Sequence, residues 1–172
     1  MEVRKDCLIM HCDLTDLYIK QKELDLEIAN NHHISYESTY EKRVLALLVE
    51  LGELANATRT FKFWSNKGPE TKERVLDEYA DGLHFLLSIG LAYHYQVDSI
   101  EVDEEKVEPT DAILKSYHYI NEFYNDRNLS KYLVAFEFYL KILASLGYTW
   151  SEAYDAYFKK LEENRHRQDT NY

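Results

Sequence analysis

Apolar residues recur along most of this chain at intervals of three and four, the spacing that places them on one side of an α-helix. The pattern predicts about six helices, at residues 13–29, from Ser35 or Ser38 to 60, 70–95, 112–124, 130–146 and 151–165. No segment shows the bounded alternation of apolar and polar residues that is typical of a β-strand. The polar, acidic residues 98–109 are expected to form a surface loop. We therefore expect residues 1–172 to form a single all-α domain, a helical bundle.

Local signals place several helix ends. Ser38 with Glu41 three residues later has the spacing of a capping box at the start of the second helix. Residues 65–69, Ser-Asn-Lys-Gly-Pro, form the clearest turn in the chain. Gly147 is suited to end the fifth helix, and Thr149 or Ser151 to cap the sixth.

Two pairs of acidic residues interrupt the apolar runs of the second and third predicted helices. They are Glu50 with Glu53 and Glu78 with Asp81. Residues three apart share a helix face, so each pair presents two carboxylates side by side in apolar surroundings. Burying four such groups is prohibitive unless cations neutralise them, and oxygen ligands suit Mg²⁺ or Mn²⁺. A single pair of this kind more often marks a solvated stripe, but two facing pairs would build a metal site able to handle phosphates.

A glycine lies beside each acidic pair, Gly52 in the first and Gly82 in the second. Glycine inside a helix costs up to about 1 kcal/mol relative to alanine. These positions therefore indicate that another helix or a ligand approaches the backbone closely.

Composition narrows the classes of partner. The net charge of −11 argues against binding to polymeric DNA or RNA, but it is compatible with a nucleotide that arrives with Mg²⁺. Cys7 and Cys12 lack the spacing of a metal site and are expected to be reduced thiols. The chain contains no apolar run of membrane-spanning length and no signal peptide, so we expect a cytoplasmic protein that does not enter a membrane. The fifteen tyrosines are expected in the core or at a subunit interface.

Polar residues near the C-terminus form a second candidate site. Tyr157, Lys160, Asn164, Arg167 and Gln168 are spaced by 3, 4, 3 and 1 and therefore share one helix face. Lysine, arginine and amide donors suit the oxygens of a triphosphate. The other interpretation is a solvated basic helix end favoured by the helix dipole.

The acidic pairs, separated by residues 54–77, resemble the E-x-x-E and E-x-x-D motifs of the all-α NTP pyrophosphatase superfamily, which contains MazG-like enzymes and the dimeric dUTPases. Residues 17–25 look like the helix that reads uracil in the dimeric dUTPases, and residues 60–67 are similar to their aromatic segment. Residues 157–172 resemble their tail, Y-x-x-K-N-x-x-N-x-x-R-Q-x-x-G-Y. The chain departs from this tail at Leu161, where the pattern has Asn, and at Asn171, where it has Gly.

The resemblance implies a homodimer that hydrolyses dUTP to dUMP and pyrophosphate, with dUDP as a second substrate. It implies at least two Mg²⁺ ions, replaceable by Mn²⁺, on the four acidic residues, and Glu50 as the group that orients or deprotonates the attacking water. It also implies contacts to the base from Gln21, Asp25 and either Phe63 or Trp64. Contacts to the phosphates are implied for Lys160 and Arg167, with Tyr157, Asn164 and Gln168 completing the cradle.

Three alternatives remain open. The chain could be a MazG-like pyrophosphatase for another nucleotide, or a non-catalytic helical interaction module. It could also be read as a di-iron bundle built on Asp81 with His84 and Glu163 with His166. The di-iron interpretation is disfavoured because the first acidic pair has no histidine and His166 lies in the polar tail.

Overall fold

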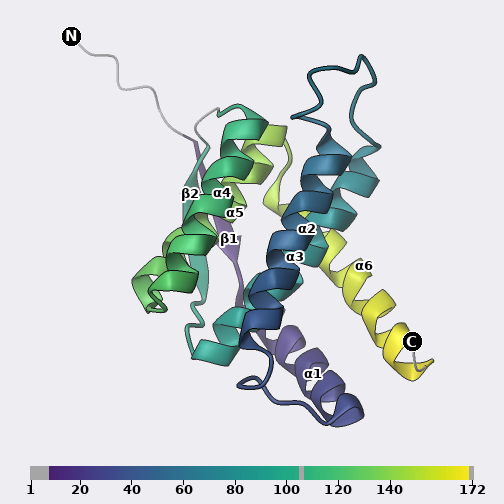
Figure 1. The fold of residues 1–172 in the computed structure, drawn as a ribbon, viewed down its shortest axis with the longest axis vertical. Coiled ribbons are helices and arrows are strands. Elements are labelled where there is room, and N and C mark those ends of the chain that lie inside the picture. Colours follow the sequence, from purple (N-terminus) through teal and green to yellow (C-terminus); the bar gives the residue numbers. More distant parts are fainter. Residues whose placement is uncertain (1–7, 105–106, 171–172) are drawn as a thin grey trace.

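The computed structural model of the chain describes residues 8–104 and 107–170. These residues form the helices α1 (Thr15–His32), α2 (Tyr40–Thr58), α3 (Lys72–Tyr93), α4 (Pro109–Asn125), α5 (Leu129–Leu146) and α6 (Trp150–Asp169), and the strands β1 (Ile9–Asp13) and β2 (Ser99–Asp103) (Figure 1). The prediction of an all-α helical bundle is confirmed. Among the described residues, no helix has the length and apolar character required to span a bilayer.

The two short strands were not predicted. β1 and β2 pair antiparallel, with Ile9 opposite Asp103 and Cys12 opposite Ile100. The expectation of a surface loop was therefore wrong for Ser99–Asp103. Only Val102 of β2 is fully buried. A five-residue strand with one buried side chain shows too little alternation of apolar and polar residues to be predicted from the sequence. Its pairing depends on a segment near the other end of the chain.

Helix α3 occupies the centre of the molecule and contacts α1, α2 and α6. It runs antiparallel to α2, while α4 and α5 form a second antiparallel pair beside them (Figure 1). Leu47 and Leu51 of α2 and Leu83 and Leu87 of α3 are almost completely buried where these helices meet. Burying a leucine side chain contributes about 1.5–3 kcal/mol, so this contact holds α2 firmly against α3.

Tyrosines from α4 and α5 approach the two glycines that flank the acidic pairs. A Cβ atom on Gly82 would lie 2.2 Å from the hydroxyl oxygen of Tyr139, which donates a 2.7 Å hydrogen bond to the carbonyl of Tyr79. A Cβ on Gly52 would lie 3.2 Å from the hydroxyl oxygen of Tyr117. The predicted close approach is confirmed, and the approaching group is a tyrosine side chain.

Two helix ends in the C-terminal half follow the predicted signals. Gly147 ends α5 with a φ of 70°, and Thr149 forms a capping box with Glu152 at the start of α6. The capping box predicted for Ser38 was wrong, because α2 begins after Thr39 and Ser38 bonds instead to the backbone N–H of Ser35. Helix α6 also continues beyond the predicted residue 165, to Asp169.

Candidate active site

Three of the four predicted metal ligands meet between α2 and α3. Carboxylate oxygens of Glu50, Glu78 and Asp81 all lie within 4.8 Å of one another, a spacing at which they could hold a metal ion. Glu53, one turn further along α2, is exposed and does not belong to this group. The antiparallel contact of α2 and α3 thus assembles three carboxylates and leaves the fourth at the edge.

The cluster of three carboxylates, Glu50, Glu78 and Asp81, is electrostatically unfavourable without a cation. Burial, followed by the charges of Asp81, Glu78 and Glu53, raises the pKa of Glu50 to about 7. Burial also raises the pKa values of Glu78 and Asp81. Raised pKa values mean that each ionised carboxylate is destabilised here, which is the condition under which a divalent cation binds strongly.

Lys160 lies against these carboxylates. Its ammonium nitrogen is 2.8 Å from Asp77 Oδ1 and 2.9 Å from Asp81 Oδ2, and its side chain is only 4% exposed. Arg74 is paired with Asp77 at 2.8 Å and also with Glu78. Two protein cations therefore partly neutralise the α3 side of the cluster, while Glu50 has neither of them as a direct partner.

A pocket of about 530 Å³ lies between α1, α2, α3 and α6, with Glu50 and Asp81 in its wall. The size suits a small ligand such as a nucleotide. Predicted site residues from α1, from the acidic pairs of α2 and α3, and from α6 line it: Gln21, Asp25, Glu50, Asp81, Asn164, Arg167 and Gln168. It is also lined by polar residues that were not predicted to bind a nucleotide: Thr39, Lys42, Arg43, His84 and Ser88.

Asp25 is buried in a dense hydrogen-bond network. Its Oδ1 accepts a 2.9 Å bond from Gln21 Nε2, and its Oδ2 accepts bonds from Ser88 (2.6 Å) and Tyr36 (3.0 Å). Arg43 lies 3.6 Å from Oδ1. Asp25 therefore connects α1, α2, α3 and the segment between α1 and α2, and it orients Gln21.

His84 completes the network from α3. Its Nδ1 is 2.7 Å from Gln21 Oε1, and its ring stacks on Tyr157 with centroids 4.1 Å apart. Burial lowers the pKa of His84 to about 3. The hydroxyl of Tyr157 also points at Gln21 Oε1, at 3.2 Å. His84 lies one turn after Asp81, the spacing that a di-iron site would use for its ligands.

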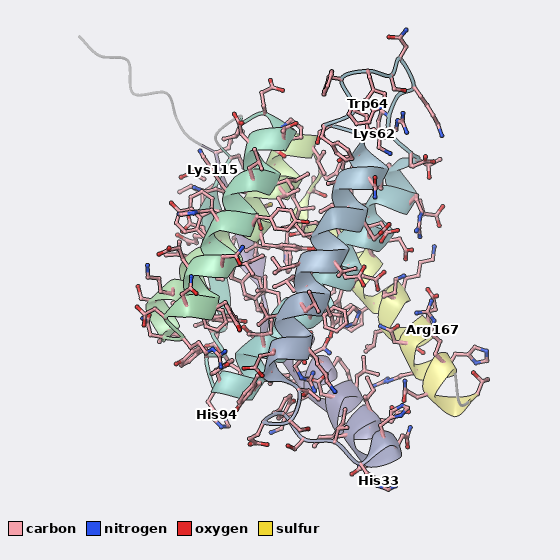
Figure 2. The ribbon with its side chains drawn as sticks, viewed as in Figure 1. His33, Lys62, Trp64, His94, Lys115 and Arg167 are labelled. Carbon is pink, nitrogen blue, oxygen red and sulfur yellow. The ribbon has the colours of Figure 1, made fainter. Side chains whose placement is uncertain are left out.

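The structure separates some predicted residues from the pocket. Phe63 and Trp64 lie in the segment between α2 and α3, exposed by 93% and 65%, and neither lines the pocket. Figure 2 shows Trp64 at one end of α2, with Arg167 on α6 well away from it. Tyr157 is fully buried, and its hydroxyl serves Gln21 and the carbonyl of Leu17. None of these three aromatic residues lines the pocket within the single chain.

The C-terminal helix brings its polar face to the pocket, as its spacing predicted. Asn164, Arg167 and Gln168 all line it. Gln168 Oε1 is also 3.2 Å from Nε2 of His32, which joins α6 to the end of α1. Leu161, the departure from the tail pattern, is 1% exposed and belongs to the interior. Asn171 lies outside the described residues.

The comparisons with known proteins agree with this geometry. A family model described as dUTPase matches residues 13–172. A comparison with curated proteins found no match. The matched region includes all six helices, the carboxylate group and the pocket, and enzymes of this family generally use a divalent metal. The chain therefore belongs to the dimeric, all-α dUTPase family, and it is an enzyme that hydrolyses dUTP.

Proposed function

We propose that the protein is a Mg²⁺-dependent enzyme that converts dUTP to dUMP and pyrophosphate and also cleaves dUDP. One observation carries this proposal: a single pocket joins Glu50 and Asp81 at one wall to Gln21 and Asp25 at another. Such a pocket accommodates a base and a metal-bound phosphate chain together. The oxygen ligands fit Mg²⁺, with Mn²⁺ as a substitute.

Glu50, Glu78 and Asp81 are proposed to hold the metal ions, with Glu53 completing the set from the exposed edge. When bound, the ions neutralise phosphate charge and make a bound water more acidic. Glu50 is the proposed base, because it lines the pocket and because neither Lys160 nor Arg74, which pair with the other carboxylates, is its direct partner. It accepts a proton from the water that attacks the α-phosphorus, and the bond to the β-phosphate oxygen breaks to release pyrophosphate.

The C-terminal helix is proposed to hold the β- and γ-phosphates. Arg167, Asn164 and Gln168 supply donors from the pocket wall. Lys160, beside Asp81, supplies a charge next to the metal ligands. Lys42 is a further cation in the pocket lining. Tyr157 supports the site by contacting Gln21 and not by contacting phosphate.

The proposed homodimer would cover apolar side chains that one chain leaves exposed. Leu45 and Val49, one turn apart on α2, are 63% and 52% exposed. Contiguous apolar patches of this kind are typical of interaction surfaces. Phe63 and Trp64 also have no pocket contact within their own chain, so we propose that either one reaches a base only across the dimer. The buried free thiol of Cys12 is compatible with the proposed cytoplasmic location.

Release of pyrophosphate from a panel of deoxynucleoside triphosphates tests this function. With Mg²⁺, we expect hydrolysis of dUTP in strong preference to dCTP, and no hydrolysis by Glu50→Gln. The exposed Glu101→Gln on β2 is the matched control and should retain activity. Equal turnover of dUTP and dCTP would favour a MazG-like pyrophosphatase acting on other nucleotides, and an active Glu50→Gln would contradict the role of Glu50.

A further inference from the structure

The two ends of the Gln21 side-chain amide have different partners. Its nitrogen donates one hydrogen to Asp25 Oδ1 at 2.9 Å. Its oxygen faces His84 Nδ1 at 2.7 Å and the Tyr157 hydroxyl at 3.2 Å. The single hydrogen of the Tyr157 hydroxyl is shared between this oxygen and the carbonyl of Leu17 at 3.1 Å, and the two neighbours together cover both lone pairs of the amide oxygen. Within the described residues, Asp25 is the only acceptor bonded to this nitrogen, and its second N–H remains for a ligand.

The partners of His84 determine which of its ring nitrogens carries the proton. His84 is neutral at ordinary pH because burial lowers its pKa to about 3, so it has a single N–H. Nδ1 faces Gln21 Oε1 at 2.7 Å, whereas Nε2 faces the Tyr157 carbonyl at 3.3 Å. Either tautomer leaves one ring nitrogen with its lone pair facing an oxygen. A proton on Nδ1 satisfies the 2.7 Å contact and leaves this repulsion at the longer distance of 3.3 Å. We therefore assign the proton to Nδ1.

Rotating the Gln21 amide by 180° is disfavoured at Asp25. The amide oxygen would then face a carboxylate, and two buried acceptors would lie against each other with no donor between them. Asp25 therefore fixes the orientation of Gln21, and this orientation presents the amide oxygen to His84.

We propose that His84 is a positioning residue for base specificity, which keeps Gln21 as a pure hydrogen-bond donor toward the base. This inference rests on the proposed function, in which Gln21 contacts the base. A donor matches the O4 carbonyl of uracil but meets another donor in the 4-amino group of cytosine. A glutamine amide can offer a base both a donor and an acceptor, but the acceptor of Gln21 is already covered by His84 and Tyr157.

A matched pair of substitutions in the full-length enzyme tests the role of His84. In His84→Asn, the amide nitrogen is attached to Cγ, as Nδ1 is, and can still donate to Gln21. In His84→Phe, the ring can still stack on Tyr157 but the donor is lost. The measured quantity is kcat/KM for dUTP divided by kcat/KM for dCTP, with Mg²⁺ present. We expect this ratio to fall at least about tenfold in His84→Phe, mainly through KM, and to remain within about threefold of the parent in His84→Asn.

Two further measurements make the outcomes distinct. If Gln21→Ala leaves the ratio unchanged, the base contact of Gln21 is wrong and the role of His84 fails with it. The role of His84 alone is refuted if Gln21→Ala lowers the ratio but His84→Phe does not. It is also refuted if His84→Asn lowers the ratio as much as His84→Phe does. Nitrogen-15 NMR of the parent at pH 7 should show His84 protonated at Nδ1, and protonation at Nε2 would overturn the inference without any variant. His11→Phe, on the exposed face of β1, is the control for adding a phenylalanine.

Discussion

Replacing Glu50 with glutamine should make the metal-free protein more stable at pH 8 while abolishing dUTP hydrolysis. Glu50 lies beside Glu78 and Asp81. Burial and these neighbouring charges raise its pKa to about 7 from an ordinary value of 4.5. The folded protein therefore binds the Glu50 proton more tightly than the unfolded chain does. Its stability should fall as the pH rises from about 4.5 to 7, and the full cost is present above pH 7.

The size of the effect follows from the pKa difference. A change from 4.5 to about 7 corresponds to about 3 kcal/mol. Glu50 is only half-buried, so solvent screens its repulsion, and we halve this value to about 1.5 kcal/mol. Glutamine has nearly the same shape and no charge. We therefore expect Glu50→Gln to raise the free energy of unfolding by about 1.5 kcal/mol at pH 8 and by a few tenths of a kcal/mol at pH 5.

Urea unfolding followed by circular dichroism, in EDTA and at one protein concentration, measures this difference. Glu101→Gln is the control, since Glu101 is exposed on β2 and should give no pH-dependent gain. A gain of equal size at pH 5 and pH 8 would show that glutamine improves packing and not charge. A loss of stability at pH 8 would refute the reasoning, because it would mean that ionised Glu50 is already compensated without metal.

Two further predictions follow from the same region. Because Glu50 must lose its proton to bind a cation, the affinity for Mg²⁺ should rise about tenfold per pH unit between pH 5.5 and 7 and level off above pH 7. Calorimetry in two buffers should detect the released proton, and pH-independent binding would contradict this competition. Gly82→Ala should destabilise the fold by about 1–3 kcal/mol despite its better helix propensity, because the new Cβ would lie 2.2 Å from the Tyr139 hydroxyl. Adding Tyr139→Phe should recover part of this loss in a double-mutant cycle, and simple additivity would show that the two side chains do not collide.

Several features of this protein could be predicted because they depend only on neighbours along the chain. Helical periodicity gave the all-α class and placed Glu50, Glu78 and Asp81 in apolar helix faces, where their charges require a partner. The spacing of Asn164, Arg167 and Gln168 correctly predicted one shared face, since that face follows from the pitch of a single helix. The glycine positions likewise indicated a close approach, although not the tyrosines that make it.

Contacts between helices were decided only by the tertiary structure. Lys160 lies on the same helix face as Arg167, but the packing of α6 against α3 turns it onto Asp77 and Asp81. His84 joins Gln21 in the lining of the pocket because α1 brings Gln21 within 2.7 Å of it. The physical reason is that a helix repeat specifies which residues share a face, while the partner of that face depends on how distant segments pack. Sequence spacing alone therefore identified the chemical groups of the site, and the fold determined which of them meet.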